Sequence, residues 1–189
     1  MQKVFRVVYM MLMCQTFISF SLLAQKKNFV LVEAESFNEK GGWVLDQQFM
    51  DQMGSPFLLA HGIGKPVQDA STEVMIPKKG IWHVYARTWN WCSPWKTKES
   101  PGRFKIAVNG AVLDNELGMG TQWDWEYAGS VEIKDKSNIV TLKDLTGFEG
   151  RCDAILFAKD KNSVIPNRKE DLSVFRKQLL NIPAKPEDG

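Results

Sequence analysis

The chain has 189 residues, with 24 basic against 22 acidic side chains, and 44% of its residues are hydrophobic. This near balance of charge excludes the basic surface that nucleic-acid binding requires. The length is enough for one domain with a hydrophobic core and a tail.

Residues 1–24 have the layout of a secretory signal, with two basic residues, an apolar run over residues 7–23, and Ala24 before a polar segment. A single membrane anchor is the alternative, but four polar residues dilute the run. Lipid attachment at Cys14 is disfavoured, because Met13 stands where a small residue is needed. We expect cleavage and export to the periplasm, the cell surface or the outside. Cleavage brings the basic residues from 24 to 22, equal to the acidic ones.

Short strand-like segments separated by turn residues fill residues 29–159, almost without helical periodicity. This pattern predicts an all-β fold, an antiparallel β-sandwich or barrel, which we assign to residues 25–160. Asn109-Gly110 is the strongest hairpin signal in the chain. The expected strands lie within residues 29–37, 81–89, 103–108, 111–113, 125–134, 138–145 and 154–158.

The first expected strand carries Glu33 and Glu35, which point to the same face because side chains alternate along a strand. Asp153 stands just before the last strand and would join them if the first and last strands lie side by side. A hard cation held by oxygen ligands would explain the three acids, whereas zinc would need imidazole or thiolate, and neither His61 nor His83 has a partner at metal-binding spacing. We therefore predict a structural calcium site at these acids. A chelator that removes the ion should then lower the melting temperature of the protein. Three unrelated surface carboxylates are the alternative.

Two loops, residues 90–102 and 117–125, combine glycine or proline with tryptophan. Exposed apolar surface costs about 25 cal/mol per Å² in water, so a ligand or partner should cover these rings. Tryptophan can stack on sugar faces while polar side chains bond to hydroxyl groups, although a protein-docking surface uses the same residue types. Trp43 and Trp82 fall in regular strands and are expected in the core. The candidate ligand-binding residues are Trp89, Trp91, Trp95, Trp125, Arg87, Arg103 and Asp124.

Catalytic signals are weak. No serine stands in a nucleophile elbow, and no cysteine has a histidine and a carboxylate at a family-specific spacing. Asp124 and Glu126, two apart on a strand, could imitate a glycosidase pair, but such a pair is easily found among 22 acidic residues. We assign no catalytic residue. Cys92 and Cys152 could form a disulfide or stay reduced, and the sequence leaves both open.

The composition changes after residue 160. Residues 167–180 place four apolar side chains on one side of an expected helix, with the basic residues on the other. These apolar residues are Leu172, Phe175, Leu179 and Leu180. Residues 183–189 read as a linker, so we predict a C-terminal helix and linker over residues 161–189.

Two short motifs carry a family likeness. Residues 32–37 (VEAESF) together with residues 152–155 (CDAI) resemble the galactose-binding-like jelly rolls that serve as carbohydrate-binding modules. In that group the paired glutamates and the late aspartate often hold a structural calcium ion. The resemblance therefore implies the same role for Glu33, Glu35 and Asp153.

A second likeness covers nearly all of the chain after the signal. Residues 41–51, 54–62 and 145–153 are similar to the N-terminal region of secreted FAD-dependent oxidoreductase-type proteins of Bacteroidetes. The resemblance implies a flavin domain after a linker such as residues 183–189. This chain has no Gly-x-Gly-x-x-Gly after a strand, so we expect no FAD site in it. We expect a non-catalytic accessory domain that binds a glycan or its own enzyme domain.

Overall fold

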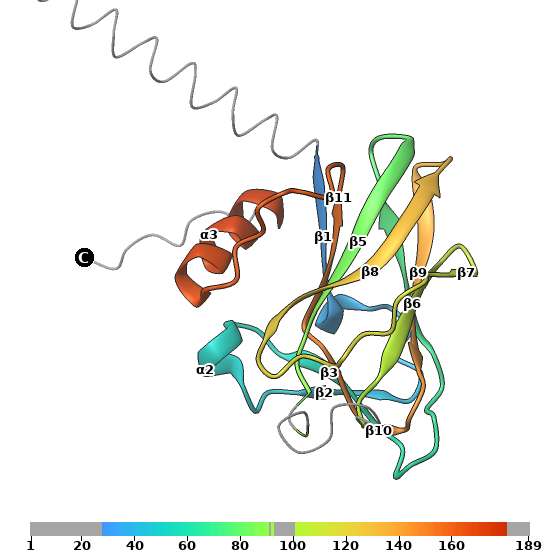
Figure 1. Cartoon of the computed structure of the whole chain (residues 1–189), viewed down its shortest axis with the longest axis vertical. Helices are drawn as coiled ribbons and strands as arrows, with labels where there is room; N and C mark the ends of the chain where they lie inside the picture. Colours follow the sequence, from blue (N-terminus) through green and yellow to red (C-terminus); the bar gives the residue numbers. More distant parts are fainter. Residues whose placement is uncertain (1–27, 91, 93–100, 181–189) are drawn as a thin grey trace, which may run out of the picture.

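The structure is a computed structural model that describes residues 28–90, 92 and 101–180. Three antiparallel sheets make a β-sandwich (Figure 1), which confirms the predicted all-β class. The first sheet has the order β1 (Phe29–Glu33), β11 (Ala154–Ala158), β5 (Gly80–Thr88) and β8 (Asp124–Ile133). The second has the order β4 (Ala70–Met75), β9 (Ser137–Asp144), β6 (Phe104–Val108) and β7 (Ala111–Val112). The third has the order β10 (Phe148–Cys152), β3 (Phe57–His61) and β2 (Trp43–Asp46).

In the part of the chain that the structure describes, three helical segments accompany the strands. A 3-10 turn, η1 (Ala34–Ser36), follows β1 directly, and α2 (Met50–Met53) is a single turn that ends at Gly54 with a left-handed φ of 83°. The longer α3 (Lys169–Leu180) lies beside β1, on the side away from β9 and β6 (Figure 1). Within the described ranges no helix is long and apolar enough to cross a bilayer. The predicted signal at residues 1–24 and linker at 183–189 lie outside the described residues.

The first and last strands of the sandwich pair directly, as the sequence predicted. β1 and β11 are antiparallel, with a register that runs from Phe29 opposite Ala158 to Glu33 opposite Ala154. All five residues of β11 are buried, because one face of the strand meets the core and the other meets α3. This pairing fixes the position of Glu33 relative to the junction of β10 and β11.

The main core lies between the sheets and includes the two tryptophans expected there. Trp43 and Trp82 are both buried, and Trp43 packs edge-on against Phe104 with 5.6 Å between ring centroids. The Nε1 of Trp82 donates a hydrogen bond to the Lys78 carbonyl at 2.8 Å, so this polar atom is satisfied inside the core. Burying rings of this size supplies a large share of the hydrophobic stabilisation.

A second apolar cluster joins α3 to the outer face of the first sheet. Leu172 and Phe175 are buried there, and Phe175 meets Phe29 of β1 with 5.5 Å between centroids. Leu179 packs at the margin, whereas Leu180 stays partly exposed. The prediction that the basic residues lie on the opposite side is wrong for Arg176, which is 8% exposed. It follows Leu172 by four residues, and positions i and i+4 share a helix face.

Substituting Gly147 should destabilise the loop between β9 and β10. Gly147 has φ +64°, and a Cβ there would lie 2.0 Å from the Lys65 carbonyl oxygen, whereas Gly110 has φ +82° with no atom within 4 Å of such a Cβ. We expect Gly147→Ala to lower the free energy of unfolding by roughly 2–4 kcal/mol, and Gly110→Ala by only about 1 kcal/mol, measured by urea denaturation. Equal losses would show that the close approach to Lys65 is unimportant.

Candidate functional site

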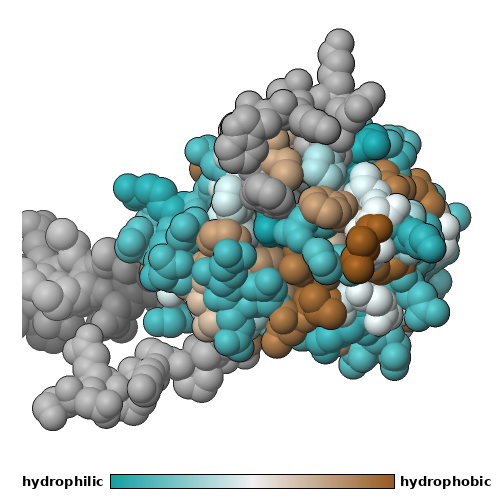
Figure 2. Space-filling model, turned by 90° about the horizontal axis from the view of Figure 1, so that it is seen from below, coloured by the Kyte–Doolittle hydropathy of each residue, from teal (hydrophilic) through white to brown (hydrophobic). Residues whose placement is uncertain are grey.

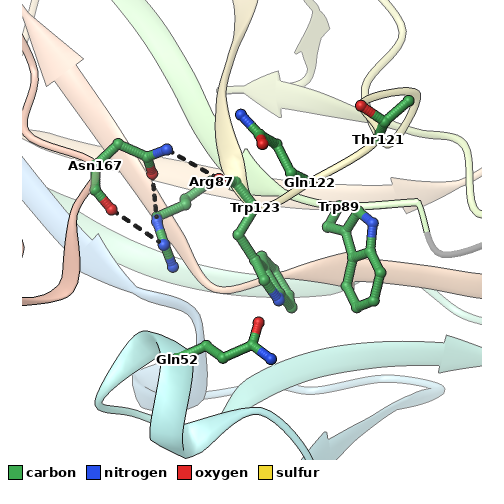
Figure 3. Close-up of a pocket in the computed structure, with 7 residues that line it drawn as sticks. All are labelled: Gln52, Arg87, Trp89, Thr121, Gln122, Trp123 and Asn167. Carbon is green, nitrogen blue, oxygen red and sulfur yellow. Dashed lines mark hydrogen bonds between the residues drawn. The ribbon is translucent and has the colours of Figure 1, made fainter.

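A pocket of about 450 Å³ opens where the ends of several elements converge. Its size lies within the range of roughly 300–1,000 Å³ that ligand sites occupy. β5 contributes its end and the residue after it, α2 contributes one side chain, and the segments before β8 and α3 supply the rest. The lining residues are Gln52, Arg87, Trp89, Thr121, Gln122, Trp123 and Asn167 (Figure 3).

Two tryptophans form the apolar wall of the pocket. The rings of Trp89 and Trp123 are 5.9 Å apart and tilted by 55°. Phe49 meets Trp89 at 5.0 Å and Phe57 meets Trp123 at 5.4 Å, so aromatic rings back both side chains. Trp123 is only 7% exposed. We expected a ligand or partner to shield the loop tryptophans from solvent. For Trp123, residues of the same chain, including Met53 of α2, provide this shielding.

The polar wall is held together by hydrogen bonds around Asn167 (Figure 3). Arg87 Nε donates to Asn167 Oδ1 at 3.0 Å, and Arg87 Nη2 donates to the Asn167 carbonyl at 3.4 Å. Asn167 Nδ2 donates to the Trp123 carbonyl at 2.9 Å. Arg87 also forms an ion pair with Asp153 at 3.0 Å. The charge of Arg87 is therefore balanced inside the protein, and this side chain shapes the pocket.

Three exposed polar side chains remain at the mouth of the pocket. Gln52 faces the two indole rings from α2, and Thr121 and Gln122 stand on the other side of them (Figure 3). Amide and hydroxyl groups both donate and accept hydrogen bonds. The pocket thus combines an apolar wall with neutral polar groups.

Glu126 orders the loop that leads into the pocket. Its carboxylate accepts hydrogen bonds from the backbone N–H groups of Gly118 at 2.8 Å, Met119 at 3.1 Å and Gly120 at 2.7 Å. Asp124 instead accepts from the backbone N–H of Trp125 at 2.8 Å. Both carboxylates therefore accept hydrogen bonds from backbone N–H groups, and this arrangement fits a structural role for Glu126 and for Asp124.

The predicted ligand-binding residues are not all in one place. Arg87 and Trp89 line the pocket, but Arg103, Asp124 and Trp125 do not. Trp125 packs on the cluster beneath α3, where its Nε1 donates to the Pro166 carbonyl at 2.9 Å. Arg103 forms an ion pair with Glu116 at 2.7 Å. Trp91 and Trp95 lie outside the described residues. A role in ligand binding stays a prediction for all seven.

Sequence reasoning did not find Gln52 or Asn167. Gln52 lies on a helix of one turn, which is too short to give a periodic signal. Asn167 stands two residues before α3, where an asparagine reads simply as part of a helix start. Only the fold brings these residues to the tryptophans.

The expectation that Glu33 and Glu35 share one face of a strand is wrong, because β1 ends at Glu33 and Glu35 lies in the 3-10 turn η1. The three acids predicted to bind calcium nevertheless lie close enough to influence one another. Glu35 and Asp153 both raise the pKa of Glu33 by electrostatic repulsion. Two arginines reach the same group of acids: Arg176 Nη2 is 2.8 Å and Arg87 Nη1 is 3.0 Å from Asp153 Oδ2. Arg176 Nε also lies 2.8 Å from Glu33 Oε1.

Burial dominates the electrostatics of the two glutamates. It raises the pKa of Glu33 to about 8, against the lowering effect of Arg176, and it raises the pKa of Glu35 to about 7. The Oε2 atoms of both residues are buried and make no hydrogen bond in the described structure. Among the described residues no group of three histidine, cysteine or acidic side chains is placed to hold a metal ion. With Arg176 bound to Glu33 and Asp153, the acids do not fit a calcium ion. The calcium site expected from the sequence is not tested by this geometry alone, and the melting experiment described below decides between the ion and the arginine.

Cys92 and Cys152 are not joined by a disulfide. Cys152 is buried beside Asp153, and burial raises the pKa of its thiol well above the usual value. Of the two possibilities left open by the sequence, the structure has both cysteines as free thiols.

Comparison with known proteins identifies the fold. No protein-family model and no curated protein matches the sequence. The structure is similar to a GH26-CBM35 β-(1,4)-mannanase from Podospora anserina, with a TM-score of 0.54 and 16% identity over 74% of this chain and 29% of the mannanase. It is also similar to a family 35 carbohydrate-binding module from Clostridium thermocellum, with a TM-score of 0.52 and 16% identity over 68% of this chain and 96% of the module.

A third structure has the same architecture. The C-terminal CBM6 of the laminarinase LamC from Zobellia galactanivorans matches with a TM-score of 0.50 and 18% identity, over 70% of this chain and 100% of the module. The chain therefore has the jelly-roll sandwich fold of these modules. It covers nearly all of each isolated module but under a third of the whole mannanase.

Asn167→Ala should weaken the pocket wall. The change removes the side-chain bonds to Arg87 and to the Trp123 carbonyl and leaves a buried guanidinium donor unpaired. We expect a loss of roughly 1–3 kcal/mol in the free energy of unfolding, measured by urea denaturation, and a shift in tryptophan emission. Asn162→Ala, at an exposed position, is the control and should change stability by less than about 0.5 kcal/mol. A loss at Asn167 no larger than in the control would contradict the bonding role.

Proposed function

We propose that this chain is an exported, non-catalytic module that binds a carbohydrate in the pocket of Trp89 and Trp123. The observation that carries the proposal is the pocket itself, in which the half-buried indole of Trp89, packed beside the buried Trp123, lies close to exposed neutral polar side chains. The jelly-roll fold shared with carbohydrate-binding modules supports the same function.

The chemistry of the lining suits a neutral sugar. A pyranose ring offers an apolar C–H face that packs on an aromatic ring, and hydroxyl groups that both donate and accept hydrogen bonds. Gln52, Thr121 and Gln122 supply matching neutral groups. Arg87, the charged residue of the lining, already forms an ion pair with Asp153. An acidic sugar would therefore gain little from this pocket compared with a neutral one.

The accessory role is part of the proposal. The likeness of residues 41–51, 54–62 and 145–153 to secreted FAD-dependent oxidoreductase-type proteins supports a place ahead of a flavin domain, which would hold the cofactor. The module would then keep that enzyme close to a glycan.

A protein-docking surface is the second candidate function. β2 is the edge strand of the three-stranded sheet, and it exposes Val44 by 52% and Leu45 by 47%. Figure 2, which views the molecule from below, shows apolar side chains among hydrophilic ones on this face. Exposed apolar side chains of this kind suit contact with a partner domain.

Glycan binding should change the tryptophan fluorescence, because two indoles line the pocket. We expect a saturable response to at least one neutral polysaccharide in a panel from plant, host and bacterial sources. Gln122→Ala, which removes one hydrogen-bonding group from the pocket, should weaken binding roughly 3–10-fold, while Gln48→Ala, exposed and outside the pocket, should leave it unchanged. Flat titrations throughout the panel would exclude sugar binding and favour docking.

The accessory role makes a separate prediction at the level of the gene. A Gly-x-Gly-x-x-Gly motif between a strand and a helix should be encoded in the region that follows residue 189 or in the neighbouring reading frame. Inspection of the genomic sequence checks this directly. Its absence would leave a free-standing module as the better account.

A further inference from the structure

One buried and two half-buried acids at one place need compensation for their negative charge. Asp153 is 0% exposed, and Glu33 and Glu35 are both removed from solvent enough to raise their pKa values. Taking an ionised carboxylate out of water is very unfavourable unless a cation or several hydrogen bonds compensate. In proteins that compensation comes from a metal ion or from a basic side chain, or the carboxyl group takes up a proton instead, which the raised pKa values of Glu33 and Glu35 favour.

Arg176 meets this need with all three nitrogens of its guanidinium group. Nε lies 2.8 Å from Glu33 Oε1 in an ion pair, although its N–H makes no hydrogen bond among the described residues, and Nη2 donates to Asp153 Oδ2 at 2.8 Å. Nη1 donates to the Met53 carbonyl at 2.7 Å. The planar group thus reaches the end of β1, the junction of β10 and β11, and the end of α2 at once. A lysine ammonium, which is a point charge, could not reach three separated acceptors in the same way.

We propose that Arg176 is the structural counter-ion of Glu33 and Asp153 and takes the place that a bound divalent cation would otherwise have. The positive charge is part of the chain and arrives when α3 docks. On this reading α3 is an integral part of the jelly-roll domain.

The counter-ion also connects α3 to the pocket. Asp153 Oδ2 accepts from Arg87 as well as from Arg176, and Arg87 is held in turn by Asn167 just before α3. On the other side, Arg176 holds the carbonyl of Met53, the neighbour of the pocket residue Gln52. The same guanidinium group therefore contacts the acid that binds Arg87 and the backbone next to Gln52. The inference concerns stability and metal dependence, so its test is independent of sugar binding.

Thermal unfolding with and without metal tests the proposal on the unmodified protein. We expect the same melting temperature in excess EDTA and in about 5 mM calcium, a concentration above the roughly millimolar Kd of weak extracellular calcium sites. A melting temperature that rises with calcium or falls with EDTA would overturn the proposal, because a metal ion would then be the counter-ion.

Substitutions in α3 provide a second test of the proposal. Arg176→Gln leaves the acids without their partner and should lower the melting temperature by roughly 6–20 °C. Lys177→Gln, the adjacent and exposed residue with the same change of charge, is the matched control and should shift it by less than about 2 °C. Equal effects of the two substitutions would overturn the assignment.

Arg176→Lys keeps the experiment decisive if the glutamine variant is too unstable to purify. It retains a positive charge near the acids and should fold, with a melting temperature below that of the unmodified protein. A lysine variant that melts no lower than the unmodified protein would contradict the need for a guanidinium group. A lysine variant that folds no better than the glutamine variant would contradict the role of charge.

Discussion

Asp153 bears a carboxylate at a point that solvent does not reach, and an isolated charge there would destabilise the fold by several kcal/mol. Its side chain accepts from Arg87, Arg176 and Ser55, so both oxygens are bonded. Its backbone N–H donates to the Arg87 carbonyl, and its carbonyl accepts from Ala34. One residue thereby joins η1, β5, α3 and the segment after α2. The pocket is built on this junction, because Arg87 connects Asp153 to Asn167 and, through it, to Trp123.

Local signals made part of the fold predictable, although β3, β4 and β10 were not among the expected strands. β11 has the bounds that were expected, and β5 begins and ends one residue earlier than predicted, because apolar strands bounded by turn residues are recognisable in isolation. Asn109 and Gly110 both have positive φ, 51° and 82°, as the Asn-Gly signal requires. The adjacency of the first and last strands came from the two acidic motifs and is confirmed.

The site was less predictable because it depends on contacts between distant segments. Trp89 and Arg87 could be proposed from composition, but Gln52 and Asn167 join them only through the packing of α2 and the approach to α3. Arg176 shows a different difficulty. Its position four residues after Leu172 places it on the apolar side of the helix, yet a basic side chain in an amphipathic pattern is normally assigned to solvent. Its role can be recognised only when the fold shows that acidic side chains lie next to it.

The burial of Cys152 has a chemical consequence. Thiol–disulfide exchange needs a thiolate that a reagent can reach, and this sulfur is both inaccessible and held in its protonated form. Even among oxidants, Cys152 should therefore remain a small apolar filler of the core. Within the described residues, packing and ion pairing hold this part of the core together.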